Sequence, residues 1–319
     1  MLHAYREIAG HLQRQSAKED LAKALWIDLY SPQPEQSQAV AALGIDVPSL
    51  ADMEEIEISN RLYREGGVEY MTVVLPGHAA GKQVSAPVTF ILSKARLVTV
   101  RHHAPRPFET YPDRADKAGL GCHTPDQVFL GLIEEIIGRQ ADLLEGTGKA
   151  LDEVSLSIFG GDEGSRGAAI LQAALQRVGR EGDLLGKVRL ALLTIERAVS
   201  FFSQTLPDRP EGDANKAMVK GLSRDIQALE VHADFLANRV GLASDATLGM
   251  INLAQNSTVR IVSVVAVLFL PPTLIASIYG MNFKYMPELS QSWGYPAALG
   301  LMLASATFTY LFFKWKKWL

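Results

Sequence analysis

The feature that most constrains this chain is an uncharged apolar run near its C-terminus, Ile261–Asn282. No Asp, Glu, Lys, Arg or His occurs between Ile261 and Tyr279. A helix over that stretch, rising ~1.5 Å per residue, would be roughly 28 Å long, about the hydrocarbon thickness of a bilayer. A second uncharged run, Tyr295–Phe313, follows after a short loop. The two runs predict a pair of membrane-spanning helices.

The overall composition hides this membrane part, because charged residues still make up 21% of the chain. Nearly all of that charge lies before residue 246. The formal net charge is −4, and the sequence has no basic stripe interleaved with aromatic residues, which argues against nucleic acid as a partner. The single cysteine, Cys122, cannot form an internal disulfide, which fits a reducing compartment.

The charges that flank the two runs predict their orientation. Arg260 precedes the first run, and three lysines follow the second in the tail 314–319. The connecting loop has one lysine, Lys284, and one carboxylate, Glu288. By the positive-inside rule, both termini are expected in the cytoplasm and the loop outside. The N-terminus has no apolar segment typical of a signal peptide, so the large N-terminal part is expected to stay cytoplasmic.

The first 123 residues predict a small α/β domain. Strands are expected at 21–31, 56–63, 68–75, 86–92 and 96–102, with the last two paired as a hairpin across Ser93–Ala95. Pro34 opens a short helix, and Gly44 is placed to end it. Strands mixed with short helices favour the α/β class and leave the order of the strands open.

Long helices are expected from residue 124 onward. Thr124-Pro125-Asp126-Gln127 is a capping box with proline at the first helical position. A break at Gly160–Gly164 separates this helix from a second one over Ala168–Leu206, which Pro207 and Pro210 end. Residues 124–210 are therefore expected to form two antiparallel helices.

A third helix is expected to begin near Glu211 and meets no proline until Pro271. If it runs to Tyr279 it is roughly 100 Å long and cannot bury its own apolar side, so the sequence predicts a homo-oligomer. The expected order is a cytoplasmic stalk over 211–260, a first span over 261–279, an external loop over 280–294, a second span over 295–313 and a basic tail over 314–319.

Six residues around the start of the first run share one face of the expected helix, because they fall at alternating steps of three and four. They are Asn256, Val259, Ser263, Ala266, Leu270 and Thr273. Arranged symmetrically around an axis, this stripe would line a pore. The alternative is an ordinary seam between helices, since Ser, Ala and Thr are common where membrane helices approach closely.

The loop between the two runs resembles the signature of the CorA family of divalent-cation transporters. The residues concerned are Tyr279-Gly280-Met281-Asn282 and, after them, Met286-Pro287-Glu288-Leu289. Trp293-Gly294-Tyr295-Pro296, Trp26-Ile27-Asp28-Leu29 and Leu97-Val98-Thr99-Val100-Arg101 extend the similarity over essentially the whole chain. The tripeptide Gly-Met-Asn is specific here because of its place between two C-terminal apolar runs.

The resemblance implies a funnel-shaped homopentamer in the bacterial inner membrane, with an α/β cytoplasmic domain, a long helical stalk and two C-terminal transmembrane helices. The first span would line the pore and the second would form an outer ring. The function implied is passive influx of Mg²⁺, and also of Co²⁺ and Ni²⁺, gated by intracellular Mg²⁺. Such a protein is not an enzyme and needs no catalytic cofactor.

The resemblance also implies residue roles. Gly280-Met281-Asn282 would be the selectivity element at the outer mouth, Thr273 a deeper polar ring, Leu270 part of a hydrophobic constriction, and Asn256 a polar ring near the cytoplasmic end. Mg²⁺ gives up its water reluctantly, so an amide oxygen such as that of Asn282 suits the hydrated ion. Gly280 is expected to allow unusual backbone angles in that turn.

Four acidic residues are candidates for interaction with cations. A ring of Glu288 side chains outside the mouth would raise the local cation concentration, and the alternative is a solvated loop carboxylate. The resemblance implies regulatory Mg²⁺ sites between adjacent subunits, for which Asp213, Asp225 and Asp234 are candidates. Gly221 replaces a position that is acidic in some relatives, and solvated helix carboxylates are the alternative for all three aspartates.

Two other functions stay open at this point. One is a Zn²⁺ transporter of the ZntB type, although those relatives tend to lack the stretch Met286–Leu289. The other is a membrane-anchored sensor or scaffold without transport. An enzyme is not indicated: His102-His103 point to opposite faces of a strand, Cys122-His123 lacks a second pair of zinc ligands, and Gly160–Gly164 is no phosphate loop.

Overall fold

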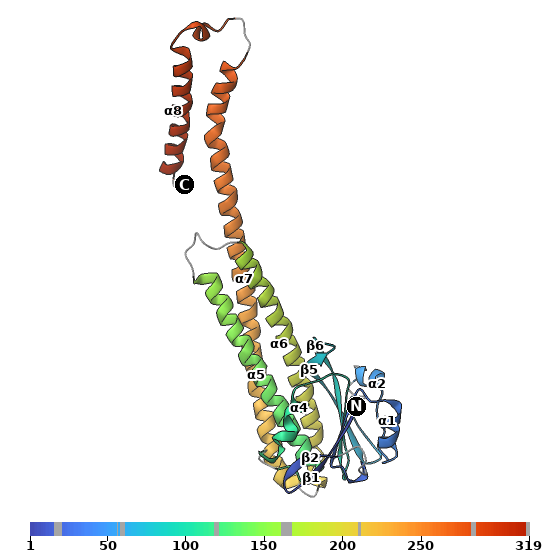
Figure 1. Ribbon diagram of the computed structural model, residues 1–319. Coiled ribbons are helices and arrows are strands. Elements are labelled where there is room, and N and C mark those ends of the chain that lie inside the picture. Colours follow the sequence, from blue (N-terminus) through green and yellow to red (C-terminus); the bar gives the residue numbers. More distant parts are fainter. Residues whose placement is uncertain are drawn as a thin grey trace. The chain divides into compact units, whose positions relative to one another are not determined.

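The computed structural model describes residues 1–15, 21–55, 57, 61–117, 121–160, 168–209, 212–281 and 285–316 (Figure 1). The chain forms two compact units. The first unit comprises Met1–Leu156 and Gln176–Ser244, and the second comprises Ser157–Leu175 and Asp245–Leu319. Parts of several predicted features lie outside the described residues, namely 161–164 of the Gly-rich break, Pro210, Glu211, Asn282, Lys284 and 317–319.

The first unit contains a seven-stranded sheet in the order β2-β1-β3-β7-β6-β5-β4. Its strands are β1 (Leu2–Ile8), β2 (His11–Arg14), β3 (Trp26–Tyr30), β4 (Leu62–Glu65), β5 (Val68–Ala79), β6 (Lys82–Leu92) and β7 (Leu97–Arg101). The pairing of β3 with β7 is parallel, and the other pairings are antiparallel. Shorter elements are α1 (Pro34–Ala41), α2 (Leu50–Glu54), α4 (Pro107–Thr110) and the 3₁₀ turns η1 (Leu21–Lys23), η2 (Tyr111–Asp113), η3 (Ala115–Lys117) and η4 (Leu206–Asp208).

The structure confirms the strands predicted at 68–75, 86–92 and 96–102, including the hairpin in which Leu92 lies opposite Leu97. The strand predicted at 21–31 is right only from Trp26, because residues 21–23 form η1. Of the strand predicted at 56–63, residues 56 and 58–60 lie outside the described residues, and Leu62 and Tyr63 belong to β4. Strands β1 and β2 were not predicted, because charged and exposed residues obscure their alternation.

Alternate side chains of the sheet enter two separate cores, as the two-residue period of a strand requires. Trp26 of β3 belongs to a core shared with Phe129 and Phe202 of the long helices. Its neighbour Ile27 belongs to the other core, which also contains Val40 of α1 and Met53 of α2. The sheet is therefore covered on both faces, which explains the continuous apolar runs of its central strands.

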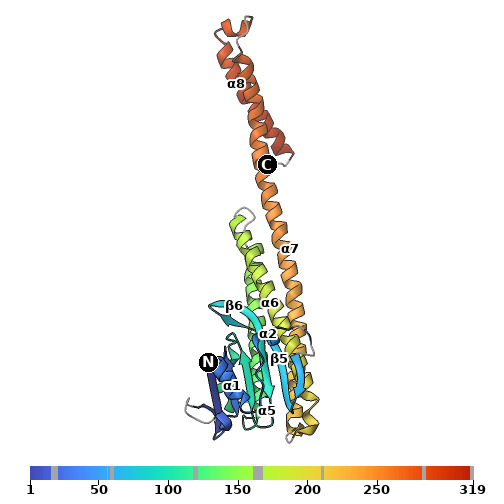
Figure 2. The same ribbon diagram turned by 90° about the vertical axis from the view of Figure 1, so that its right-hand side faces the viewer.

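The first unit also holds most of the long helices α5 (Pro125–Phe159) and α6 (Ala168–Ser203) and the N-terminal part of α7 (Gly212–Tyr279), up to Ser244. The three run side by side there (Figures 1 and 2). The amide of Gln127 donates to Thr124 Oγ1 at 3.3 Å, as the capping box predicts. Gln127 Oε1 also accepts from the amide of His123 at 2.9 Å. The second predicted helix ends at Ser203 instead of Leu206, which begins the 3₁₀ turn η4.

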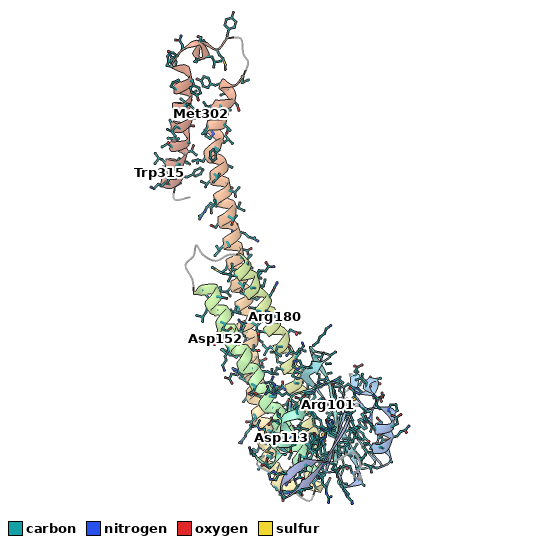
Figure 3. The ribbon with its side chains drawn as sticks, in the orientation of Figure 1. Arg101, Asp113, Asp152, Arg180, Met302 and Trp315 are labelled. Atoms are coloured by element: carbon teal, nitrogen blue, oxygen red, sulfur yellow. The ribbon has the colours of Figure 1, made fainter. Side chains whose placement is uncertain are left out.

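A buried ion pair joins the parallel strands β3 and β7 (Figure 3 labels Arg101). Asp28 Oδ2 accepts from Arg101 Nη2 at 2.9 Å, and Asp28 Oδ1 accepts from Thr99 Oγ1 at 2.9 Å. The indole of Trp26 donates to that same threonine hydroxyl at 3.0 Å. Arg101 Nη1 donates to the carbonyl of His103 at 3.0 Å. The motifs Trp26–Leu29 and Leu97–Arg101 are thus two halves of one buried polar network.

The second unit contains the C-terminal part of α7, the 3₁₀ turn η5 (Pro287–Ser290) and α8 (Gly294–Trp315). Helix α8 runs back beside the end of α7 (Figure 1). Both helices are long and apolar enough to cross a membrane, and only 6% and 11% of their most apolar windows are buried in this chain. Such exposure is expected for surfaces that meet lipid or another subunit.

The buried ion pair leads to a stability prediction. Arg101→Met leaves the Asp28 carboxylate buried without its cation, which is expected to cost about 3–5 kcal/mol. We expect a clear fall in the melting temperature of the purified protein in detergent. Arg177→Met is the control, because Arg177 pairs with Glu153 on the exposed surface, where a pair contributes less than about 1 kcal/mol. Equal melting temperatures of the two variants would contradict the role of the buried pair.

His103 leads to a prediction on pH. It is 1% exposed, its Nε2 lies 2.9 Å from the Leu75 carbonyl oxygen, and burial, aided by the charge of Arg101, lowers the pKa of His103 to about 4. Since the unfolded chain protonates this histidine near pH 6.5, stability is lost as the pH falls from 6.5 towards 4, by about 2 kcal/mol at pH 5. His103→Gln should flatten the melting profile between pH 7 and pH 5. Parallel profiles of variant and parent would refute this.

Candidate functional site

Helix α7 continues without interruption through Pro271 and Pro272. Neither proline has an amide proton, so the carbonyls of Val267 and Leu268 lose their usual partners four residues on. Helices in membranes tolerate this where neighbouring groups compensate. The second proline, whose effect the sequence left open, therefore removes a hydrogen bond but does not end the helix.

The six stripe residues all lie on α7, and every one of them is exposed in the described chain. The opposite side of the same helix is buried or half-buried at Val264, Leu268, Pro271, Pro272, Ile275 and Tyr279. At 100° per residue, the centres of these two sets differ by roughly half a turn. The stripe therefore lies on the side of α7 that this unit leaves uncovered.

Thr273 is the one hydroxyl of the stripe near the C-terminal end of α7. Its Oγ1 lies 3.1 Å from the Leu270 carbonyl and also within bonding distance of the Phe269 carbonyl. The hydroxyl can donate its single proton to only one of them, so both of its lone pairs stay available to water. The side chain is therefore suited to accept a hydrogen bond at the exposed face.

A tight turn follows α7. The amide of Gly280 donates to Ala276 at 2.9 Å and that of Met281 to Ile278 at 3.2 Å. The expectation of unusual backbone angles at Gly280 is wrong, because its φ is not positive. A Cβ there would lie 3.1 Å from the Ala276 carbonyl oxygen, so glycine is favoured by the lack of space. Asn282, the predicted ion-binding amide, lies outside the described residues.

The loop ends with a close backbone contact that the sequence did not reveal. Glu288 is exposed on η5, and its carbonyl oxygen would lie 2.1 Å from a Cβ added at Gly294. Only glycine can occupy the first position of α8 in this arrangement. The motif Trp293-Gly294-Tyr295-Pro296 thus ties the start of α8 to the turn that bears Glu288.

The three candidate regulatory aspartates lie far apart along α7. Asp213 is in its first turn, Asp225 is close enough to Glu134 to raise the pKa of that carboxyl, and Asp234 pairs with Arg189 at 2.8 Å. Within the described ranges, no group of three or more His, Cys, Asp or Glu side chains could hold a metal ion. One chain therefore does not bring these aspartates together, and their metal-binding role stays a prediction.

An ion cluster that sequence reasoning missed lies just before α7. Arg209 Nη2 donates to Glu69 of β5 at 2.7 Å, and Nη1 donates to Asp126 at the start of α5. The guanidinium also lies 4.7 Å from the centre of the Phe202 ring. The partners are far from Arg209 in sequence, so no local pattern predicts the cluster. It holds the segment leading into α7 against the sheet and α5.

Comparison with known proteins agrees with this architecture. The sequence profile of the family described as CorA-like Mg²⁺ transporter protein matches residues 22–316. The magnesium transport protein CorA of Yersinia pseudotuberculosis is 34% identical over 325 residues, with all of both chains covered.

Solved structures show the same fold. The complete CorA magnesium transporter of Methanocaldococcus jannaschii is similar with a TM-score of 0.74 at 17% identity, over 100% of this chain and 99% of that one. The cytoplasmic domain of ZntB from Vibrio parahaemolyticus is similar over 77% of this chain and 96% of its own, with a TM-score of 0.56 and 10% identity. The family match over nearly the whole sequence and the full-length relative lead to one conclusion: the chain is a member of the CorA-like Mg²⁺ transporter family.

Proposed function

We propose that this protein is a channel for passive influx of Mg²⁺ across the inner membrane. The observation that carries the proposal is the continuous helix α7, whose uncharged, uncovered stripe leads to the Gly280-Met281 turn between two apolar helices. Relatives named as magnesium transport proteins support Mg²⁺ as the ion. Mg²⁺ is the cargo in this proposal, and no catalytic cofactor is involved. Both termini lie in the cytoplasm, following the flanking lysines.

The proposed assembly is a homopentamer around the stripe. Apolar side chains on the α7 segment of the first unit support association, since Val231 is 71% exposed, Phe235 56% and Leu242 70%. Large apolar residues exposed at such a regular spacing mark a face that another helix covers. The number five comes from the family resemblance, and copies of the same chain are the proposed partners.

Within such a pore the stripe residues take different roles. Leu270 forms the hydrophobic constriction, and a ring of Thr273 hydroxyls accepts hydrogen bonds from hydrated ions beside it. Asn256 forms a polar ring towards the cytoplasm, with Val259, Ser263 and Ala266 between. An apolar constriction gates by excluding water, so small movements of α7 would switch conduction.

The outer mouth selects the ion in this proposal. A ring of Asn282 amides binds Mg²⁺ with its water shell, because removing that water is costly. The exposed Glu288 side chains attract dications without binding them tightly. Regulatory Mg²⁺ would bind at Asp213, Asp225 or Asp234 between adjacent subunits, where carboxylates of two chains can meet.

Replacing the mouth amide tests the proposal. Asn282→Ala should abolish Mg²⁺ uptake into potential-driven liposomes, because the hydrated ion loses its ring of acceptors. Gln291→Ala in the same loop is the control and should leave uptake unchanged, since its side chain is exposed. Mg²⁺, Co²⁺, Ni²⁺ and Zn²⁺ are measured side by side. Normal Mg²⁺ flux in Asn282→Ala, or selective flux of Zn²⁺ in the parent, would refute the assignment.

The stripe can be tested against a scaffold that uses the helices only as an anchor. Thr273→Leu should lower Mg²⁺ flux about fivefold or more, the equivalent of about 1 kcal/mol for one hydrogen bond. Thr307→Leu on α8 is a matched control, because Thr307 is also exposed and its hydroxyl bonds a carbonyl four residues back at 2.8 Å. Equal flux in the two variants would favour an ordinary packing seam between helices, or a membrane-anchored scaffold, over a pore lined by the stripe.

A further inference from the structure

The short segment that joins η5 to α8 has a proline at each end. Pro287 is the first residue of η5, and Pro296 lies in the first turn of α8. Because the ring of proline fixes the angle φ, the backbone at both ends has little freedom to rotate. The turn lies directly beside the start of α8 (Figure 1). The segment that bears Glu288 is therefore restrained by its own sequence.

Two backbone hydrogen bonds connect Glu288 to the first residue of α8. The Glu288 carbonyl accepts from the amide of Gln291 at 3.3 Å, and the Gln291 carbonyl accepts from the amide of Gly294 at 3.0 Å. The Glu288 carbonyl group also occupies the space that a Cβ at Gly294 would need. These are backbone atoms, which cannot rotate aside as the end of a flexible side chain can. Any side chain at position 294 would therefore push the turn away from α8.

The side chain of Glu288 is exposed, and no ion pair neutralises it within the part of the chain that the structure describes. A carboxylate on a freely moving loop spreads its charge over a large volume. One on a fixed backbone keeps its charge near one point, and a ring of such charges focuses the field that attracts cations. The contact at Gly294 therefore bears on cation capture, although Gly294 itself has no charge.

We propose that Gly294 is a positioning residue for cation capture. By admitting the Glu288 carbonyl against its Cα atom, it holds the Glu288 carboxylate at a fixed place beside the proposed outer mouth. This role rests on the proposed function, because it matters only if cations enter past Glu288. Gly294 acts through Glu288 and does not contact the ion.

The experiment measures Mg²⁺ uptake into liposomes over a range of Mg²⁺ concentrations, and it separates the half-maximal concentration from the maximal rate. Glu288→Gln should raise the half-maximal concentration about tenfold, the lower end of the gain that focused charge provides. Gly294→Ala should raise it about threefold, because the carboxylates are displaced but not removed. Gly300→Ala is the matched control and should change neither quantity, since nothing lies within 4 Å of a Cβ at this exposed glycine of α8.

A double substitution separates positioning from a purely structural role. With Glu288→Gln in place, Gly294→Ala should have no further effect on the half-maximal concentration, because no charge is left to displace. Loss of packing alone would lower the maximal rate and the melting temperature in either background. Salt provides a second readout: at about 1 M monovalent salt, where the Debye length is about 3 Å, the difference between the parent and Gly294→Ala should vanish.

An exchange variant tests the position of the charge without adding a side chain at Gly294. Glu288→Gln with Gln291→Glu keeps the composition of the loop and moves the carboxylate to an exposed neighbouring residue. The backbone hydrogen bonds of both residues are kept. We expect this variant to behave like Glu288→Gln, because the charge has left its fixed place. It also decides the question if Gly294→Ala does not assemble.

The possible outcomes distinguish this role from the proposed function. A parent protein without Mg²⁺ uptake would refute both. If the parent takes up Mg²⁺, the role of Gly294 is overturned by equal half-maximal concentrations in Gly294→Ala and Gly300→Ala. It is also overturned if Gly294→Ala has the same effect with and without Glu288, or if the exchange variant regains the half-maximal concentration of the parent.

Discussion

The structure depends on one constraint: a single helix, α7, has to be stable both in the first unit, which contains the sheet, and in the second unit, which contains the two apolar helical segments. Its apolar surface in the first unit is only partly covered, as the exposure of Val231 and Leu242 shows. Its C-terminal part is almost entirely uncovered. A helix of this length gains little from its own hydrogen bonds and needs packing along its sides. The proposed association of several copies would supply that packing, and the proposed pore would follow from it.

The segment just before α7 is held by buried ion pairs, whereas the apolar sides of the helix are largely uncovered. Arg209, just before the helix, bonds to Glu69 of the sheet and to Asp126 of α5. All three side chains are largely buried, so the attraction is weakly screened and the loss of one partner is costly. The cluster therefore ties the segment that precedes α7 to both the sheet and α5.

The sequence predicted the features that depend on local spacing. Strands β5, β6 and β7 were recognisable because they are buried on both faces, and the stripe on α7 because helical spacing is local. Strands β1 and β2 were missed, since their exposed polar residues resemble a loop. Contacts between distant residues were out of reach: Asp28 and Arg101 are 73 positions apart, and Arg209 and Glu69 are 140 apart. At the candidate site, the family resemblance supplied the expected roles of the residues. The expectation that Gly280 adopts unusual backbone angles was wrong.

The contact between Gly294 and the Glu288 carbonyl has a consequence for how this protein can vary in evolution. Because the backbone of the turn η5 rests directly on the first residue of α8, the segment between them cannot change its length without separating the two. Residues on the turn can exchange freely, whereas insertions and deletions would displace the acidic side chain from its place beside the membrane helices. Relatives that differ in ion preference are therefore expected to differ there by substitution at constant loop length.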